Sequence, residues 1–149
     1  MFARYLFIDD VRRPPSQIAS PGAGAIRDPE WKDIVQAVER FDAINVRMIV
    51  IGEEPPSSDM PSDGRFVVIG RQTTGPKFTY HMYVPDDRSM HVLVDPSQPP
   101  GIECEVLVGQ HRTEDLRFCV PIDLLLTGLK RFYEIGNRDP SLVWEAGEY

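Results

Sequence analysis

Paired acidic side chains are the residues of this chain best suited to chemistry. Three pairs fall in predicted turns or on the outward side of a predicted strand: Glu53 and Glu54, Asp86 and Asp87, and Glu103 and Glu105. Each pair taken alone is typical of a solvated surface. Together, the carboxylates would form an acidic field that speeds docking onto a basic protein and imitates the charge of a polynucleotide in that protein's substrate cleft.

The net charge narrows the classes of partner. The chain of 149 residues has 16 Lys and Arg and 23 Asp and Glu residues, so its formal net charge is −7. Nucleic-acid binding depends on clustered Lys and Arg, so this balance argues against nucleic acid as the main partner. Residues 1–27 hold four arginines and two aspartates, which leaves −9 on residues 28–149. The acidic character therefore belongs to the main body of the chain.

A second acidic motif stands near the N-terminus. Residues 6–12 resemble the first strand of response-regulator receiver domains, in which paired acids such as Asp9 and Asp10 bind Mg²⁺ beside a phosphoacceptor. Glu53 stands where a receiver would carry its phosphoacceptor Asp, but the rest of the chain lacks the alternating strands and helices. We interpret Asp9 and Asp10 as a solvated strand end. A receiver-like or nucleotide-handling enzyme that uses them is the alternative hypothesis.

Two other patterns point away from catalysis. Residues 70–77 have the glycine spacing of a phosphate loop, but a proline removes an amide donor and a strand follows, so we predict a hairpin loop. If Val84 pairs with Met90, then His81 and His91 are diagonal neighbours on the polar face of a hairpin, and two ligands are too few for a zinc site. We predict no catalytic residues, no metal and no cofactor.

The two cysteines and the hydropathy bear on location. Cys104 and Cys119 are solitary, which is more typical of buried thiols than of a disulfide. No segment has the ~20 consecutive apolar residues of a membrane span, and the N-terminus lacks the features of a signal peptide. We expect a cytoplasmic protein with no membrane partner.

The elements that position these residues follow from periodicity. Apolar residues at helical spacing predict a helix over 31–41, with Asp28 as its cap, and another between Pro121 and Gly136. The remaining periodic segments have a period of two and predict strands at 5–8, 46–51, 66–69, 78–84, 90–94, 102–108, 116–120 and 142–144.

These elements together predict an α+β fold. We expect a curved antiparallel β meander of about five to seven strands packed against two helices. In the predicted register, the apolar face of the hairpin consists of Phe78, Tyr80, Met82, Val84, Met90, Val92 and Val94. Residues 1–27 are expected to be an N-terminal strand and a Pro- and Gly-rich arm, followed by a single domain over 28–149.

The C-terminal segment carries a family resemblance. The run 120–145, in which a helix leads through Gly136 and Pro140 to Trp144, resembles the close of the first-numbered Imm family, the immunity proteins of bacterial polymorphic toxin systems. Asp139 separates Arg138 from Pro140, whereas the family more commonly joins Arg directly to Pro. We interpret the motif as architectural: Gly136 stops the helix, Pro140 fixes the turn and Trp144 packs back onto the helix.

The resemblance implies a non-enzymatic antidote. Such a protein binds the catalytic domain of a cognate toxin, usually a nucleic-acid deaminase or nuclease, and neutralises it by occluding the active site. The motif does not mark the contact surface, for which the six paired acids are the candidates. A structural subunit of a secretion or phage assembly is a further alternative.

Overall fold

The structure is a computed structural model that describes residues 1–12, 25–54 and 64–147. These residues form an antiparallel sheet and two α-helices, which confirms the predicted α+β class. The helices are α2 (Trp31–Glu39) and α3 (Ile122–Ile135). The strands are β1 (Tyr5–Asp10), β2 (Ile26–Arg27), β3 (Val46–Gly52), β4 (Phe66–Gln72), β5 (Phe78–Val84), β6 (Ser89–Val94), β7 (Glu103–Val108), β8 (Gln110–Asp115) and β9 (Val143–Gly147). Neither described helix is long and apolar enough to cross a bilayer.

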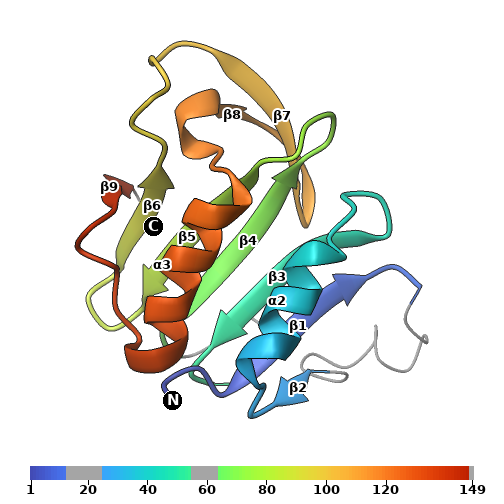
Figure 1. Ribbon diagram of the computed structural model, residues 1–149, viewed down its shortest axis with the longest axis vertical. Helices are drawn as coiled ribbons and strands as arrows, with labels where there is room; N and C mark the ends of the chain where they lie inside the picture. Colours follow the sequence, from blue (N-terminus) through green and yellow to red (C-terminus); the bar gives the residue numbers. More distant parts are fainter. Residues whose placement is uncertain (13–24, 55–63, 148–149) are drawn as a thin grey trace.

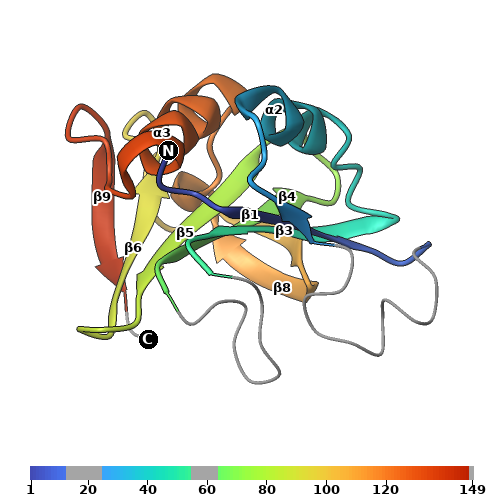
Figure 2. The same ribbon diagram turned by 90° about the horizontal axis from the view of Figure 1, so that it is seen from below.

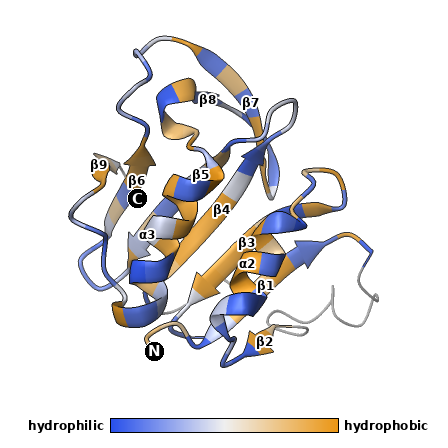
Figure 3. Cartoon of the chain, viewed as in Figure 1, coloured by the Kyte–Doolittle hydropathy of each residue, from blue (hydrophilic) through white to orange (hydrophobic). Residues whose placement is uncertain are grey.

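The sheet follows the order β2-β1-β3-β4-β5-β6-β9, and β7 pairs with both β4 and β8. Both helices cover one face, and β8 lies on the opposite side (Figures 1 and 2). Hydrophobic residues run along β3 and β4 beneath the helices (Figure 3). The core between the layers includes the fully buried side chains of Leu6, Ile34, Ile49, Ile51, Ile69, Tyr80, Leu125, Leu129 and Phe132.

The N-terminal strand belongs to this sheet. β1 pairs with β3 along its whole length, from Tyr5 opposite Gly52 to Asp10 opposite Val46. The boundary expected at residue 28 therefore does not separate the strand from the main body. The Pro- and Gly-rich arm falls within residues 13–24, outside the described residues.

Local hydrogen bonds and backbone geometry determine where α2 begins and where α3 ends. α2 begins after Glu30, whose backbone N–H donates to Asp33 Oδ2 at 2.8 Å. Asp28, the predicted cap, instead accepts a hydrogen bond from Arg4 Nε at 3.0 Å. α3 ends at Gly136, whose φ of 75° lies in the left-handed region that favours glycine. A Cβ at this position would also lie 2.5 Å from the Phe2 ring, so both the backbone conformation and the lack of space disfavour any other residue here.

The pairing of β5 with β6 differs from the prediction by one residue. Val84 pairs with Ser89, whereas the predicted partner was Met90. Successive side chains of a strand point to opposite faces, so a slip of one residue exchanges the two faces of β6. The prediction was wrong for this strand: Met90, Val92 and Val94 lie on the face away from the helices, and His91 and Leu93 lie on the helix-covered face.

The slip also separates the two histidines. His91 lies beside Met82 on the helix-covered face, whereas His81 lies on the opposite face. They are therefore not diagonal neighbours. His81 is also not an exposed strand histidine, because it is 5% exposed and its burial lowers its pKa to about 4.

The segment before α3 is not the predicted strand. Residues 116–118 form a short 3₁₀ helix, η1 (Leu116–Phe118), in which the Asp115 carboxylate accepts the backbone N–H of Arg117 at 3.1 Å. Of the predicted strand, only Val120 keeps a bridge, to Phe78. The strand in this part of the chain is β8, which ends just before η1 and which the sequence did not indicate because all six of its residues are polar or charged.

Candidate functional site

The structure divides the six predicted acidic contact residues between two ends of the sheet. Glu53 and Glu54 follow β3, and Asp86 and Asp87 form the turn after β5, so these four lie at one end. Glu103 and Glu105 lie on β7, which pairs with the other end of β4. The length of β4 separates the two groups by about 20 Å at ~3.3 Å per residue. All six are exposed, but they do not form one patch.

The distant pair has partners of its own. The Glu105 carboxylate lies 3.1 Å from His111 Nδ1, in β8. Glu103 is paired across the hairpin with Asp115, a half-buried carboxylate that forms an ion pair with Arg117. Glu103 and Glu105 therefore belong to the β7–β8 hairpin, away from the end of the sheet where the other four acids lie.

A cleft opens at that end of the sheet, where α3 runs into β9. We call this feature, with a volume of about 480 Å³, the α3 cleft, because the segment that follows α3 lines it together with β5 and β6. Figure 1 shows that the C-terminal end of α3 lies near the turn that joins β5 to β6. Its lining combines residues of the C-terminal motif with Asp87, and nothing in the sequence indicates that these two segments lie together. Its lining is Arg65, Met82, Val84, Asp87, Ser89, His91, Asn137, Arg138, Pro140 and Trp144.

Arg65 joins the motif segment to the acidic end of the sheet. Its Nη1 donates to the carbonyl oxygen of Gly136 at 3.2 Å and to Asn137 Oδ1 at 3.0 Å. Its backbone carbonyl accepts the N–H of Glu53 at 3.0 Å. One arginine therefore holds the turn after α3 beside the end of β3.

Trp144 forms the apolar wall of the α3 cleft and anchors β9. Its indole Nε1 donates to the carbonyl oxygen of Asp139 at 2.9 Å, and its ring meets Tyr80 edge to face, with centroids 5.3 Å apart. The Tyr80 hydroxyl donates to the carbonyl oxygen of Gly128, in α3. The tryptophan thus links β9, β5 and α3, and it still contributes to the cleft surface.

The charges in the α3 cleft are mixed. Hydrogen bonds from Ser89 lower the pKa of Asp87, so this carboxylate stays ionised. Desolvation lowers the pKa of His91, the nearby Arg138 lowers it further, and Asp87 opposes the shift. His91 is therefore largely neutral at pH 7. The cleft combines two guanidinium groups, one carboxylate and one neutral imidazole around an apolar base.

The cleft also holds a serine, a histidine and an aspartate, but their order differs from that of a catalytic triad. In a triad the histidine lies between the acid and the serine and passes the proton. Here Asp87 Oδ1 accepts directly from the backbone N–H of Ser89 at 2.9 Å. Within the described parts of the chain, the His91 side chain has no hydrogen bond. Asp87, Ser89 and His91 are therefore not arranged as a catalytic triad.

The acids of the receiver-like hypothesis do not assemble. Asp9 is not a solvated strand end, since it is 7% exposed and pairs with Arg47 at 3.1 Å. Asp10 accepts from Arg12 Nε and Nη2 at 2.9 and 2.7 Å. Glu53 follows Gly52, which pairs with Tyr5 at the opposite end of β1 from Asp9. The antiparallel sheet therefore places Glu53 at the wrong end of β1 for a shared metal ion.

Sequence reasoning did not identify the two arginines of the site. Arg65 and Arg138 were not among the candidate residues, and His91 was considered only as a zinc ligand, although all three line the α3 cleft. Arg138 lies within the family-like motif, which was a usable signal, whereas no local pattern marks Arg65. The described residues contain no group of three or more His, Cys, Asp or Glu side chains that could hold a metal ion.

Comparison with known proteins gives no match to a family model, to a curated protein or to a solved structure.

Proposed function

We propose that this chain is an immunity protein that binds the catalytic domain of a cognate toxin, a nucleic-acid deaminase or nuclease, and neutralises it by occluding the active site. The contact surface in this proposal is the α3 cleft, which Asp87 lines, together with an acidic rim of Asp86 and of Glu53 and Glu54, which lie at the same end of the sheet beside Arg4 and Arg27. Glu103 and Glu105 lie at the other end of the sheet and are not part of that surface.

One observation carries the proposal. The segment with the family resemblance, through Asn137, Arg138, Pro140 and Trp144, forms one wall of the cleft, and Asp87 stands among the residues that complete it. The resemblance and the acidic pair were identified from separate parts of the sequence. Their meeting in one concave site supports a binding role for the motif in addition to its structural one.

The chemistry of the site suits a protein partner with a basic substrate channel. Enzymes that act on nucleic acids bind the phosphate backbone through Lys and Arg. The acidic rim would attract that surface, while the apolar base and the two arginines of the cleft would accept aromatic and acidic side chains next to it. Such a contact blocks substrate by covering the channel and requires no reaction.

The test is co-expression with the toxin domain encoded by the neighbouring gene. We expect growth to be rescued and a one-to-one complex to be recovered, with affinity that weakens as salt increases. We also expect a single-stranded oligonucleotide substrate to compete with this protein for the toxin. Absence of both rescue and complex would overturn the proposal. Simultaneous binding of protein and oligonucleotide would overturn the occlusion mechanism.

A further inference from the structure

The two cysteines of the chain meet on the face of the sheet away from the helices. Cys104 lies on β7 and is half-buried, whereas Cys119 follows η1 and is buried. They are 15 residues apart in sequence, and their Sγ atoms lie 3.1 Å apart as free thiols. The β7–β8 pairing and the hydrogen bond that caps η1 hold the backbone on either side, so the fold itself brings the two sulfur atoms together.

We propose that Cys104 and Cys119 are a reversible dithiol–disulfide pair, oxidised by a low-molecular-weight disulfide such as oxidised glutathione. A disulfide bond of about 2.05 Å requires the two sulfur atoms to approach by only about 1 Å more. This pair is independent of the proposed toxin binding.

The difference in exposure sets the order of the reaction. The Cys104 thiol loses its proton and attacks one sulfur of oxidised glutathione, which forms a mixed disulfide and releases one glutathione thiolate. Cys119 then loses its proton and attacks Cys104 Sγ, which releases the second glutathione. The balance is two protein thiols and one glutathione disulfide giving one protein disulfide and two glutathione thiols.

The resolving step is assisted by the first step. Desolvation raises the pKa of Cys119, and hydrogen bonding and charge from Cys104 raise it further. The charge contribution from Cys104 ends once its sulfur is in a mixed disulfide. The Cys119 thiolate therefore forms more readily after Cys104 has reacted.

Oxidation would add a covalent link between the β7–β8 hairpin and the body of the fold. β7 pairs with β4 at two positions, Arg71 with Leu107 and Gln72 with Val106, and the Thr73 N–H donates to the Glu105 carbonyl oxygen at 3.2 Å. Cys119 precedes Val120, which exchanges two backbone hydrogen bonds with Phe78 of β5 at 2.8 and 2.9 Å. A disulfide thus links the β7–β8 hairpin directly to the segment that enters α3, and we expect slower amide hydrogen exchange across β7 and β8.

The experiment equilibrates the full chain with reduced and oxidised glutathione at several ratios, from both the reduced and the oxidised side. The product is identified by the loss of two hydrogen atoms in intact mass and by a Cys104–Cys119 peptide after digestion without reductant. We expect the equilibrium constant for disulfide formation to be about 100-fold larger in the folded chain than in the chain unfolded in urea. A ratio of tenfold or more supports the proposal, and a smaller ratio overturns it.

Single variants test the order of attack. Cys119→Ala should stop at the mixed disulfide on Cys104, and Cys104→Ser should remain unmodified in the folded state because Cys119 is buried. Modification of Cys104→Ser as fast as that of the wild-type chain would overturn the assignment of Cys104 as the attacking thiol. If a variant does not fold, the equilibrium constants of the wild-type chain still decide the proposal.

Discussion

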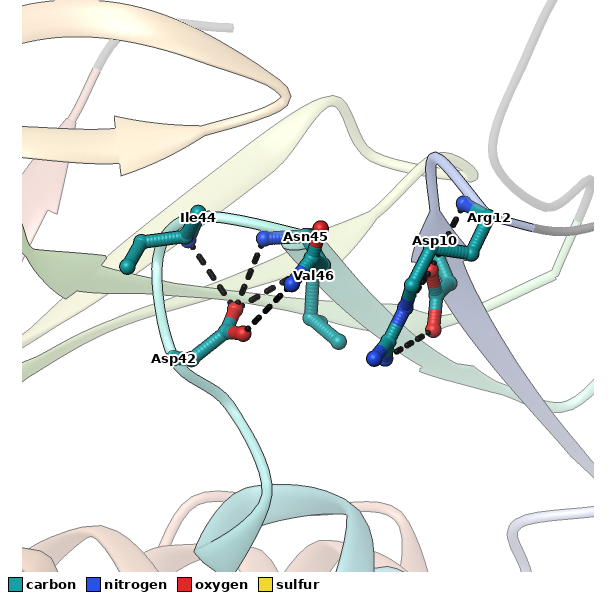
Figure 4. Close-up of polar contacts among 6 residues, drawn as sticks. All are labelled: Asp10, Arg12, Asp42, Ile44, Asn45 and Val46. Atoms are coloured by element: carbon teal, nitrogen blue, oxygen red, sulfur yellow. Dashed lines mark hydrogen bonds and ion pairs between the residues drawn. The ribbon is translucent and has the colours of Figure 1, made fainter.

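Two regions of the molecule use aspartate in opposite ways. In the loop 42–46, Asp42 Oδ1 accepts three backbone N–H groups, from Ile44, Asn45 and Val46, at 2.9 to 3.0 Å (Figure 4). At the rim of the α3 cleft, Asp87 accepts one backbone N–H, from Ser89. The Asp42 carboxylate holds the backbone of its own loop, whereas the exposed Asp87 carboxylate keeps acceptor capacity for solvent or a partner.

This difference changes the meaning of the net charge. Asp10 lies near the Asp42 loop and is engaged by Arg12 through two hydrogen bonds, as Figure 4 shows. Acids of this kind count toward the formal charge of −7 but present little unmatched charge to a partner. In the proposed function, the charge that bears on docking is the smaller set at the end of the sheet where the α3 cleft lies, and variants of the two regions should separate stability from binding.

Asp42→Ala should have the largest effect on stability. It removes an acceptor from three backbone N–H groups at once, and we expect the free energy of unfolding to fall by about 2 kcal/mol, near the upper end of single capping substitutions. Urea denaturation followed by far-UV circular dichroism measures this change. Binding to the toxin should be unaffected, because loop 42–46 contributes no residue to the α3 cleft.

Asp42→Asn is the matched control for this loop. Its amide oxygen can still accept hydrogen bonds, but without the negative charge, so the loss should be smaller than for Asp42→Ala. Equal losses for the two variants, or a loss below about 0.5 kcal/mol for Asp42→Ala, would contradict the role of the carboxylate.

The turn at Asp86 and Asp87 also shows where sequence reasoning stopped. The alternation of apolar residues predicted β5 and β6 and placed the acids between them. It did not give the register, because that depends on the turn: Arg88 adopts a φ of 55°, and Ser89 binds Asp87 and joins β6. No residue pattern within the loop distinguishes this geometry from a loop one residue longer.

Contacts between segments far apart in the sequence were a second limit on what the sequence could predict. The helix stop at Gly136 follows from local chemistry and was predicted, but the position of Arg65 beside Gly136 depends on a contact across 71 residues of sequence. The α3 cleft exists only where these segments meet. The sequence therefore predicted several of its residues but not that they form one site.

Charge reversal at the cleft should have the next largest effect. If the proposed function holds, we expect Asp86→Lys to weaken toxin binding about tenfold, because it adds repulsion toward the proposed basic surface of the partner, and to leave the unfolding free energy within about 0.5 kcal/mol. Isothermal titration calorimetry at low salt measures the affinity. Glu103→Lys makes the same change in charge at the other end of the sheet and should alter the affinity much less. Equal weakening by both variants would mean that long-range charge, and not the cleft, governs docking.

Acid should destabilise the fold partly through the Asp42 loop. Burial opposes ionisation of Asp42, but the hydrogen bonds from Ile44, Val46 and Asn45 prevail and lower its pKa to about 2 from a usual 3.8. The stabilisation is therefore complete above about pH 4 and is lost as the pH falls toward 2. Because Asp42 is exposed, screening limits it to about 1 kcal/mol. Urea denaturation between pH 5 and about pH 2 should show this loss in the wild-type chain and a smaller one in Asp42→Asn.

The smallest effect, on the titration of His91, tests the geometry of the α3 cleft without any partner. Arg138 lowers the pKa of this histidine and Asp87 raises it, so the two residues act on one imidazole from different walls of the cleft. Arg138→Gln should raise the pKa of His91, and Asp87→Asn should lower it, as measured by NMR titration of the imidazole resonances. Arg12→Gln, which removes an arginine paired with Asp10, should leave it unchanged. Shifts of the same sign in both cleft variants would mean that His91 responds to general unfolding, because only a histidine that faces both residues moves in opposite directions.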